Sequence, residues 1–116
     1  MPEKTLFTRI IDGEIPGDFV HQDEHLVAIR DIQPAAPVHL LVIPRKPIAS
    51  LAALAEEDRE LMGHLMMTVK RIAEREGLAD RGYRVVINTG EEGGQTVPHL
   101  HVHILGGARL SGHGTR

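Results

Sequence analysis

The apolar residues of the chain follow either the spacing of a helix or the spacing of a strand, and helical spacing occurs in two segments. The apolar residues of 6–11 have helical spacing and stop before Gly13, so we expect a short helix there. A longer helical stripe runs through 56–76, with acidic residues in its first turns, basic residues near its end and Gly77 as a possible cap. This second segment is predicted to be one long amphipathic helix.

The remaining apolar segments have the spacing of strands. Strands are expected at 19–21, 25–30, 38–43, 83–88 and 99–105. The first two are joined by a tight connection and form a candidate hairpin, and Pro44 follows the third. Short links and a single long helix predict an α+β fold: a five-stranded antiparallel sheet with one long helix and a short N-terminal helix.

Length and composition favour one ordinary globular domain. A chain of 116 residues is too short to build two separate cores, so we expect a single domain over 1–116. Its 41% hydrophobic and 25% charged residues are typical of globular proteins, and no apolar run is long enough to cross a membrane. The mixed charge of residues 1–4 is unlike a secretion signal, which predicts a cytoplasmic location.

Charge and side-chain chemistry exclude several function classes. Thirteen Lys plus Arg against sixteen Asp plus Glu give a net charge of −3, with the signs interspersed, which argues against nucleic-acid binding. The absence of cysteine excludes disulfides and thiolate zinc sites. With no Trp, two Phe and one Tyr, a base-stacking platform is not expected.

Histidine is the outlier, with eight in the chain and three within five residues. If 99–105 is a strand, His99, His101 and His103 project from one face and the intervening apolar residues from the other. An imidazole left buried and unpaired costs about 1–3 kcal/mol, so a sheet has no structural reason to accumulate three. The row therefore indicates a functional site.

Spacing alone leaves two chemical interpretations of this row. Neutral imidazoles could ligate zinc, although no cysteine and no suitably spaced carboxylate accompanies them. Alternatively, one histidine could act as a nucleophile while its neighbours position a substrate or move protons. The glycine-rich loop 90–94, followed by Gln95 and Thr96, could direct backbone N–H groups and polar side chains toward an anion above the histidines.

The segment 99–105 resembles the His-x-His-x-His-x-x signature of the histidine triad superfamily. Segments 9–16, 31–39, 42–46 and 93–98 resemble its Hint branch in the same order, over about residues 5 to 107. In the galactose-1-phosphate uridylyltransferase branch, a glutamine stands where this chain has a third histidine. The resemblance therefore favours a hydrolase or nucleotide-binding role over nucleotidyl transfer.

The resemblance implies a purine nucleoside phosphoramidate hydrolase that acts on AMP and GMP phosphoramidates and needs no metal or cofactor. It also implies a homodimer whose two sheets join, to which 85–87 and the Met62/Met66 face of the long helix could contribute. Two alternatives remain open: a purine-nucleotide-binding regulatory protein without physiological turnover, and a zinc-binding protein.

Roles are carried over to the histidines by position. The resemblance implies that His101 attacks the α-phosphorus and forms a nucleotidyl-histidine intermediate, and that His103 contacts the phosphate and assists the leaving group. It further implies that His99 and His39 orient the nucleophile by hydrogen bonds.

The remaining implied contacts concern the nucleoside and phosphate. Asp31 matches the acidic residue that accepts hydrogen bonds from the ribose hydroxyls. Asn88, Gln95 and Thr96 fall where the family contacts ribose and phosphate. The apolar slot for the base is formed by Phe7, Ile10, Ile29 and Ile32. His21, His25 and His64 match no site and are expected at the surface or its boundary.

Overall fold

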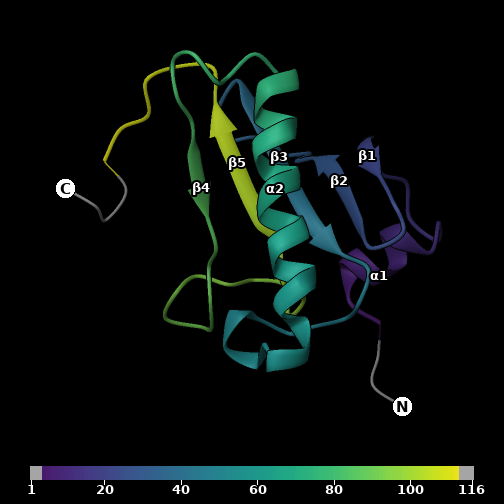
Figure 1. Ribbon diagram of the computed structural model, residues 1–116. Helices are drawn as coiled ribbons and strands as arrows, with labels where there is room; N and C mark the ends of the chain where they lie inside the picture. Colours follow the sequence, from purple (N-terminus) through teal and green to yellow (C-terminus); the bar gives the residue numbers. More distant parts are fainter. Residues whose placement is uncertain (1–3, 113–116) are drawn as a thin grey trace.

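The computed structural model describes residues 4–112 and confirms the predicted α+β class (Figure 1). Residues 1–3, which contribute to the expectation of no export signal, lie outside the described residues, as do 113–116. The regular elements are α1 (Leu6–Ile11), β1 (Phe19–Gln22), β2 (Leu26–Arg30), β3 (Val38–Pro44), α2 (Arg59–Arg75), β4 (Arg84–Val86) and β5 (Val102–Gly106). Within this part of the chain, no helix is long and apolar enough to cross a membrane.

The five strands form one antiparallel sheet in the order β1-β2-β3-β5-β4. β1 and β2 pair as the predicted hairpin, and β3 lies at the centre beside β5. In that central pair, His39 is opposite Leu105 and Leu41 is opposite His103. The register therefore makes His39 and His103 diagonal neighbours on adjacent strands, with one residue pair, Leu40 and Ile104, between them.

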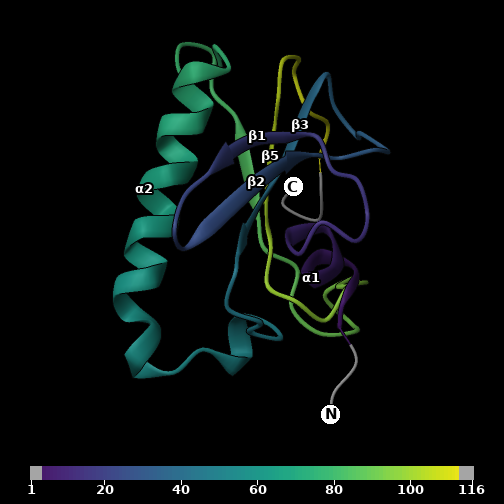
Figure 2. The ribbon, with the colours of Figure 1, turned by 90° about the vertical axis from the view of Figure 1, so that its right-hand side faces the viewer.

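Two helices lie on opposite sides of the sheet (Figure 2). α2 packs its buried Leu65, Val69 and Ile72 against one face, in a core that includes Leu40 and Val102. α1 covers part of the other face with a second cluster that includes Phe7, Ile10, Ile29, Leu41 and Ile43. Because side chains alternate along strands, His39 and His103 point to the α1 face.

The last strand is shorter than predicted, since β5 begins at Val102 and not at residue 99. His99 and His101 therefore lie in an irregular segment before the strand, and strand alternation does not position them. In this segment Leu100 donates its N–H to the carbonyl of Ile48, outside the sheet ladder. The alternation is confirmed only from Val102 onward, where buried and half-buried residues alternate.

The long helix also differs from its prediction at the start. Residues 56–58 form a separate 3₁₀ turn, and α2 begins at Arg59. The carboxylate of Asp58 accepts hydrogen bonds from the N–H of Ala55 and from the ammonium of Lys46, which stabilises this turn. At the other end, the chain passes through Gly77 with φ +77°, a left-handed conformation that glycine adopts without strain, as predicted for a cap.

His99 ties α1 to the sheet. Its fully buried ring has Nε2 at 2.8 Å from the carbonyl oxygen of Pro44, so Nε2–H donates and Nδ1 must accept. The hydroxyls of Thr5 and Thr8 lie 3.0 and 3.3 Å from Nδ1 and supply that donor. Burial lowers the pKa of His99 below its ordinary value, with the nearby His101 contributing in the same direction.

This burial predicts a pH dependence of stability. Below about pH 6.5, the unfolded chain binds a proton at residue 99 that the folded chain takes up only at lower pH. Acidification through this window should therefore lower the free energy of unfolding, and raising the pH should restore it. His99→Gln should reduce the slope between pH 6.5 and 5 by up to about 1.4 kcal/mol per pH unit in urea denaturation.

The matched control is His25→Gln, because the side chain of His25 is exposed. That variant should keep the slope of the unmodified protein. An unchanged slope in His99→Gln would show that the buried ring does not carry this acid sensitivity.

Candidate active site

Three histidine rings are in contact on the α1 face of the sheet. His39 comes from β3, His103 from β5 and His101 from the segment just before β5. The ring centroids of His101 and His103 are 5.1 Å apart, and those of His39 and His103 are 5.2 Å apart. The structure thus brings together three of the four histidines singled out in the sequence, with His99 adjacent but turned toward α1.

The tautomer of His101 is fixed by one hydrogen bond. Its Nδ1 lies 2.8 Å from the backbone carbonyl oxygen of His99, and because a carbonyl only accepts, Nδ1 carries the proton. In the neutral ring, Nε2 then has a lone pair. Phe7 packs on this ring in an edge-to-face arrangement with a centroid distance of 4.8 Å. Nε2 has no hydrogen-bond partner within residues 4–112, so it is available to attack an electrophile.

His103 is held in the opposite tautomer by a chain of hydrogen bonds. The N–H of Ala35 donates to Nδ1 of His39 over 3.0 Å, which leaves the proton of neutral His39 on Nε2. That Nε2 lies 2.9 Å from Nδ1 of His103 and donates to it. The proton of neutral His103 is therefore on Nε2. A lone pair on His101 and a donor on His103 thus occur on neighbouring rings.

These bonds change the expected roles of two residues. The resemblance implied that His99 and His39 orient His101 by hydrogen bonds. His99 does so through its carbonyl, while its ring binds Pro44 and the threonines of α1. His39 bonds to His103 and not to His101.

Asp31 lies beside the link between His39 and His103, near the same nitrogen of His39 that donates to His103. Its Oδ2 is 3.5 Å from Nε2 of His39, and its Oδ1 accepts the N–H of Gln33. Ligand atoms of Asp31, His39 and His103 all lie within 4.8 Å of one another, and this donor set suits zinc. A metal there would displace the proton shared by His39 and His103, so metal binding and the hydrogen-bond chain are alternatives.

The glycine-rich loop does not form the predicted cradle of N–H groups. The N–H groups of Gly93, Gly94 and Gln95 bond to carbonyls of Gly90 and Glu91 within the loop. The backbone N–H groups that were expected to face an anion are therefore already bonded inside a compact turn. Thr96, exposed at the end of the loop, keeps its hydroxyl and N–H unpaired among the described residues.

Two polar residues predicted to contact the nucleotide form hydrogen bonds within the protein. The amide nitrogen of Gln95 donates to the carbonyls of Ala49 and Val97, and its oxygen accepts the N–H of Gly90. Asn88 donates its amide to the carbonyl of Gly93. Both side chains therefore hold the loop in place beside the histidines.

Of the four apolar residues expected to form a base slot, three lie together in the core and the fourth is exposed. Phe7, Ile10 and Ile29 are buried in the cluster under α1, and Phe7 contacts His101. Ile32 is 92% exposed next to Asp31. Only Ile32 is therefore open to solvent beside the predicted ribose-binding residue.

Sequence reasoning missed the groups that fix the rings. Thr5 and Thr8 hold His99, and the N–H of Ala35 holds His39. The threonine at the start of α1 is recognisable as a helix cap, because its hydroxyl accepts the N–H of Thr8. No local pattern shows that these hydroxyls also reach a ring more than 90 residues later.

Comparisons with known proteins agree over nearly the whole chain. The HIT domain family model matches residues 12–110. A protein of Synechococcus elongatus named an uncharacterized HIT-like protein is 56% identical over 111 residues, which is 96% of each chain. The purine nucleoside phosphoramidase of Escherichia coli K12 is 44% identical over 110 residues, covering 95% of this chain and 92% of that enzyme.

A solved structure shows the same architecture. The HIT family hydrolase from Legionella pneumophila superposes with a TM-score of 0.91 at 44% identity, covering 93% of this chain and 96% of that one. The domain match, the identity and the shared fold agree with the histidine motif, and the protein belongs to the HIT family.

Proposed function

We propose that this protein hydrolyses purine nucleoside phosphoramidates, cleaving the bond between the phosphorus of a nucleoside 5′-phosphate and an amine nitrogen. The observation that carries the proposal is the pair of opposite tautomers: a lone pair on Nε2 of His101 beside a proton on Nε2 of His103. The similarity to a purine nucleoside phosphoramidase supports the P–N bond and the purine nucleotide as substrate.

In the first step, Nε2 of His101 attacks the α-phosphorus. A bond forms between Nε2 and phosphorus, and the electrons of the P–N bond go to the departing nitrogen. The ring of His101 gains a positive charge, which its Nδ1–H shares with the carbonyl of His99. Fixing the ring beforehand lowers the entropy cost of reaching this geometry.

His103 serves the leaving group. An amine departs readily only when its nitrogen receives a proton, and Nε2–H of His103 is the donor beside the nucleophile. Because a neutral imidazole is a weak acid, this transfer accompanies P–N cleavage. Water then attacks phosphorus, returns a proton to Nε2 of His103, and releases the nucleotide as the P–N bond to His101 breaks.

The nucleoside part of the substrate is bound by residues next to the histidines and not by the histidine rings themselves. Asp31 offers a carboxylate, which forms strong hydrogen bonds to ribose hydroxyls, and exposed Ile32 beside it offers an apolar surface to the base. Thr96 contacts the phosphate through its N–H and hydroxyl, which have no hydrogen-bond partner among residues 4–112. Asn88 and Gln95 act indirectly, by fixing the loop.

We further propose that two copies associate through β4 and α2. β4 is an edge strand of the sheet, and Val85 on it is 40% exposed. Met66 and Met67 on α2 are also exposed, whereas Met62 packs against the core. Sedimentation equilibrium at micromolar concentration should give twice the 12.8 kDa chain mass, and a mass of one chain would contradict the association.

The role of His101 is tested by His101→Ala. The variant should lose turnover of an adenosine phosphoramidate while its affinity for AMP stays within about tenfold, because a nucleophile contributes mainly to the transition state. Turnover is followed by release of the amine and AMP affinity by calorimetry. His25→Gln is the control, since its exposed ring is outside the site and its turnover should not change.

Near-normal turnover in His101→Ala would exclude the covalent mechanism. The same assay separates the two alternatives. A nucleotide-binding protein without turnover would bind AMP but release no amine in unmodified form. A zinc-dependent protein would lose its activity on treatment with a chelator.

The role of His103 is tested by changing the leaving group. His103→Gln should slow cleavage of an alkylamine substrate by about 10²–10⁴-fold, the usual contribution of a placed proton donor. Cleavage of the matching p-nitrophenyl ester should be much less affected, because that anion leaves without a proton. Equal losses with both substrates would assign His103 to binding and not to proton transfer.

A further inference from the structure

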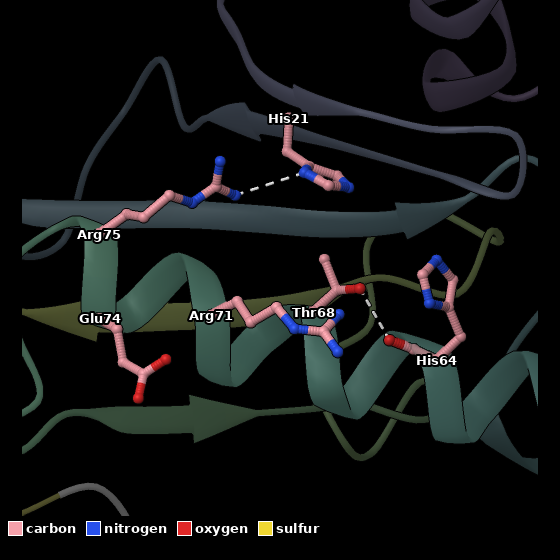
Figure 3. Close-up of a pocket in the computed structure, with 6 residues that line it drawn as sticks. All are labelled: His21, His64, Thr68, Arg71, Glu74 and Arg75. Atoms are coloured by element: carbon pink, nitrogen blue, oxygen red, sulfur yellow. Dashed lines mark hydrogen bonds between the residues drawn. The ribbon is translucent and has the colours of Figure 1, made fainter.

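A second histidine cluster lies on α2 and β1, away from the active site. A cavity of about 430 Å³, here called the His21 pocket, is lined by His21, His64, Thr68, Arg71, Glu74 and Arg75 (Figure 3). All of these residues except His21 belong to α2, which packs on the sheet face opposite the α1 site. The proposed hydrolysis uses none of these residues.

Helical spacing builds the wall of the pocket. His64, Thr68, Arg71 and Arg75 are separated by four, three and four residues, so they form one stripe along α2. Across from them, His21 comes from edge strand β1. Nη2 of Arg75 lies 3.3 Å from Nδ1 of His21, which links β1 to the last turn of α2 (Figure 3).

Asp23 fixes the two imidazoles. Its Oδ2 lies 2.8 Å from Nε2 of His21 and 2.9 Å from Nε2 of His64, so both rings donate through Nε2–H. Its Oδ1 accepts the N–H groups of His25 and Leu26. Burial acts to raise the pKa of Asp23, but these hydrogen bonds, that of His21 foremost, lower it well below its ordinary value. The carboxylate therefore stays charged and anchored.

This anchoring leaves Nδ1 of His21 with a lone pair facing Arg75. The donor Nη2–H of Arg75 requires that lone pair, so their contact exists only while His21 is neutral. A proton on Nδ1 would place two cationic donors against each other. Asp23 stabilises the charged ring from the Nε2 side, but it accepts Nε2–H and so leaves the new Nδ1–H facing Arg75.

The acidic groups around the pocket already have partners. Glu74 accepts the ammonium of Lys70 at 2.9 Å, and Glu76 accepts the guanidinium of Arg30. Glu24, next to Asp23 in the turn between β1 and β2, has its Oε2 3.8 Å from Nε2 of His25. By contrast, Arg71 has neither a hydrogen bond nor an ion pair within residues 4–112, and Arg75 has only its contact with His21.

We propose that the His21 pocket binds a small tetrahedral oxyanion of the phosphate or sulfate class, and that protonation of His21 strengthens the binding. A guanidinium group presents several N–H donors to such an anion. Arg71 and Arg75 place two guanidinium groups on the α2 side of the pocket. Protonated His21 adds an Nδ1–H donor from the other side. The anion accepts hydrogen bonds from Arg75 and from protonated His21, and so replaces the direct contact between them that protonation breaks.

Sulfate is the probe for the pH dependence, because its charge is constant between pH 7.5 and 5.5 and any change in affinity then comes from the protein. Residue-resolved NMR of the histidine rings, at constant ionic strength, separates this pocket from the active site. His21 and His64 should shift saturably with sulfate, with an apparent affinity about fivefold or more tighter at pH 5.5.

Variants assign the response to the pocket. Arg71→Gln and Arg75→Gln should each weaken the sulfate response of His64, and His21→Gln should keep a weak response that no longer depends on pH. Arg81→Gln, an exposed arginine outside the pocket, is the control and should bind like the unmodified protein. An unchanged His99 resonance verifies that each variant is folded.

Three outcomes would overturn the proposal: shifts confined to the active-site histidines, a double Arg71→Gln/Arg75→Gln variant that responds normally, or equal affinity at both pH values. Inorganic phosphate and glycerol 3-phosphate, compared at pH 5.5, then distinguish the source of the anion. A larger response to the ester identifies a phosphate monoester, and a larger response to the inorganic ion identifies the free anion.

Discussion

The hydrogen bond from Nδ1 of His101 to the carbonyl of His99 is the constraint on which the proposed chemistry depends. It decides which nitrogen of a neutral imidazole keeps its lone pair. The carbonyl is itself held in place, because the ring of His99 is buried between Pro44 at the end of β3 and the threonines at the start of α1. A buried ring with both nitrogens paired thus orients its neighbour through the backbone.

The sheet supplies the second half of the site by register. β3 and β5 pair so that His39 and His103 point to the same face and share one proton over 2.9 Å. The opposite face of β5 is fixed by Val102 and Ile104, which are buried under α2. Each such side chain contributes about 1.5–3 kcal/mol of hydrophobic stabilisation, so packing on one face holds the histidine on the other.

Periodicity in the sequence predicted both helices, all five strands and the gathering of histidines, because burial on one face leaves a regular pattern. It failed for His99 and His101, since β5 starts three residues later than the apolar alternation indicates. The loop before them was also misjudged, because its N–H groups bond within the turn. Hydrogen bonds between distant segments, such as that of Thr5 to His99, depend on the fold and leave no local signal.

The central claim is that hydrogen bonds hold the neighbouring histidines in opposite tautomers, and long-range ¹H–¹⁵N NMR of the rings reads tautomers directly. In the ligand-free protein above pH 7.5, this account predicts His101 with its proton on Nδ1, and His39, His99 and His103 with theirs on Nε2. A proton on Nε2 of His101, or on Nδ1 of His103, would contradict it.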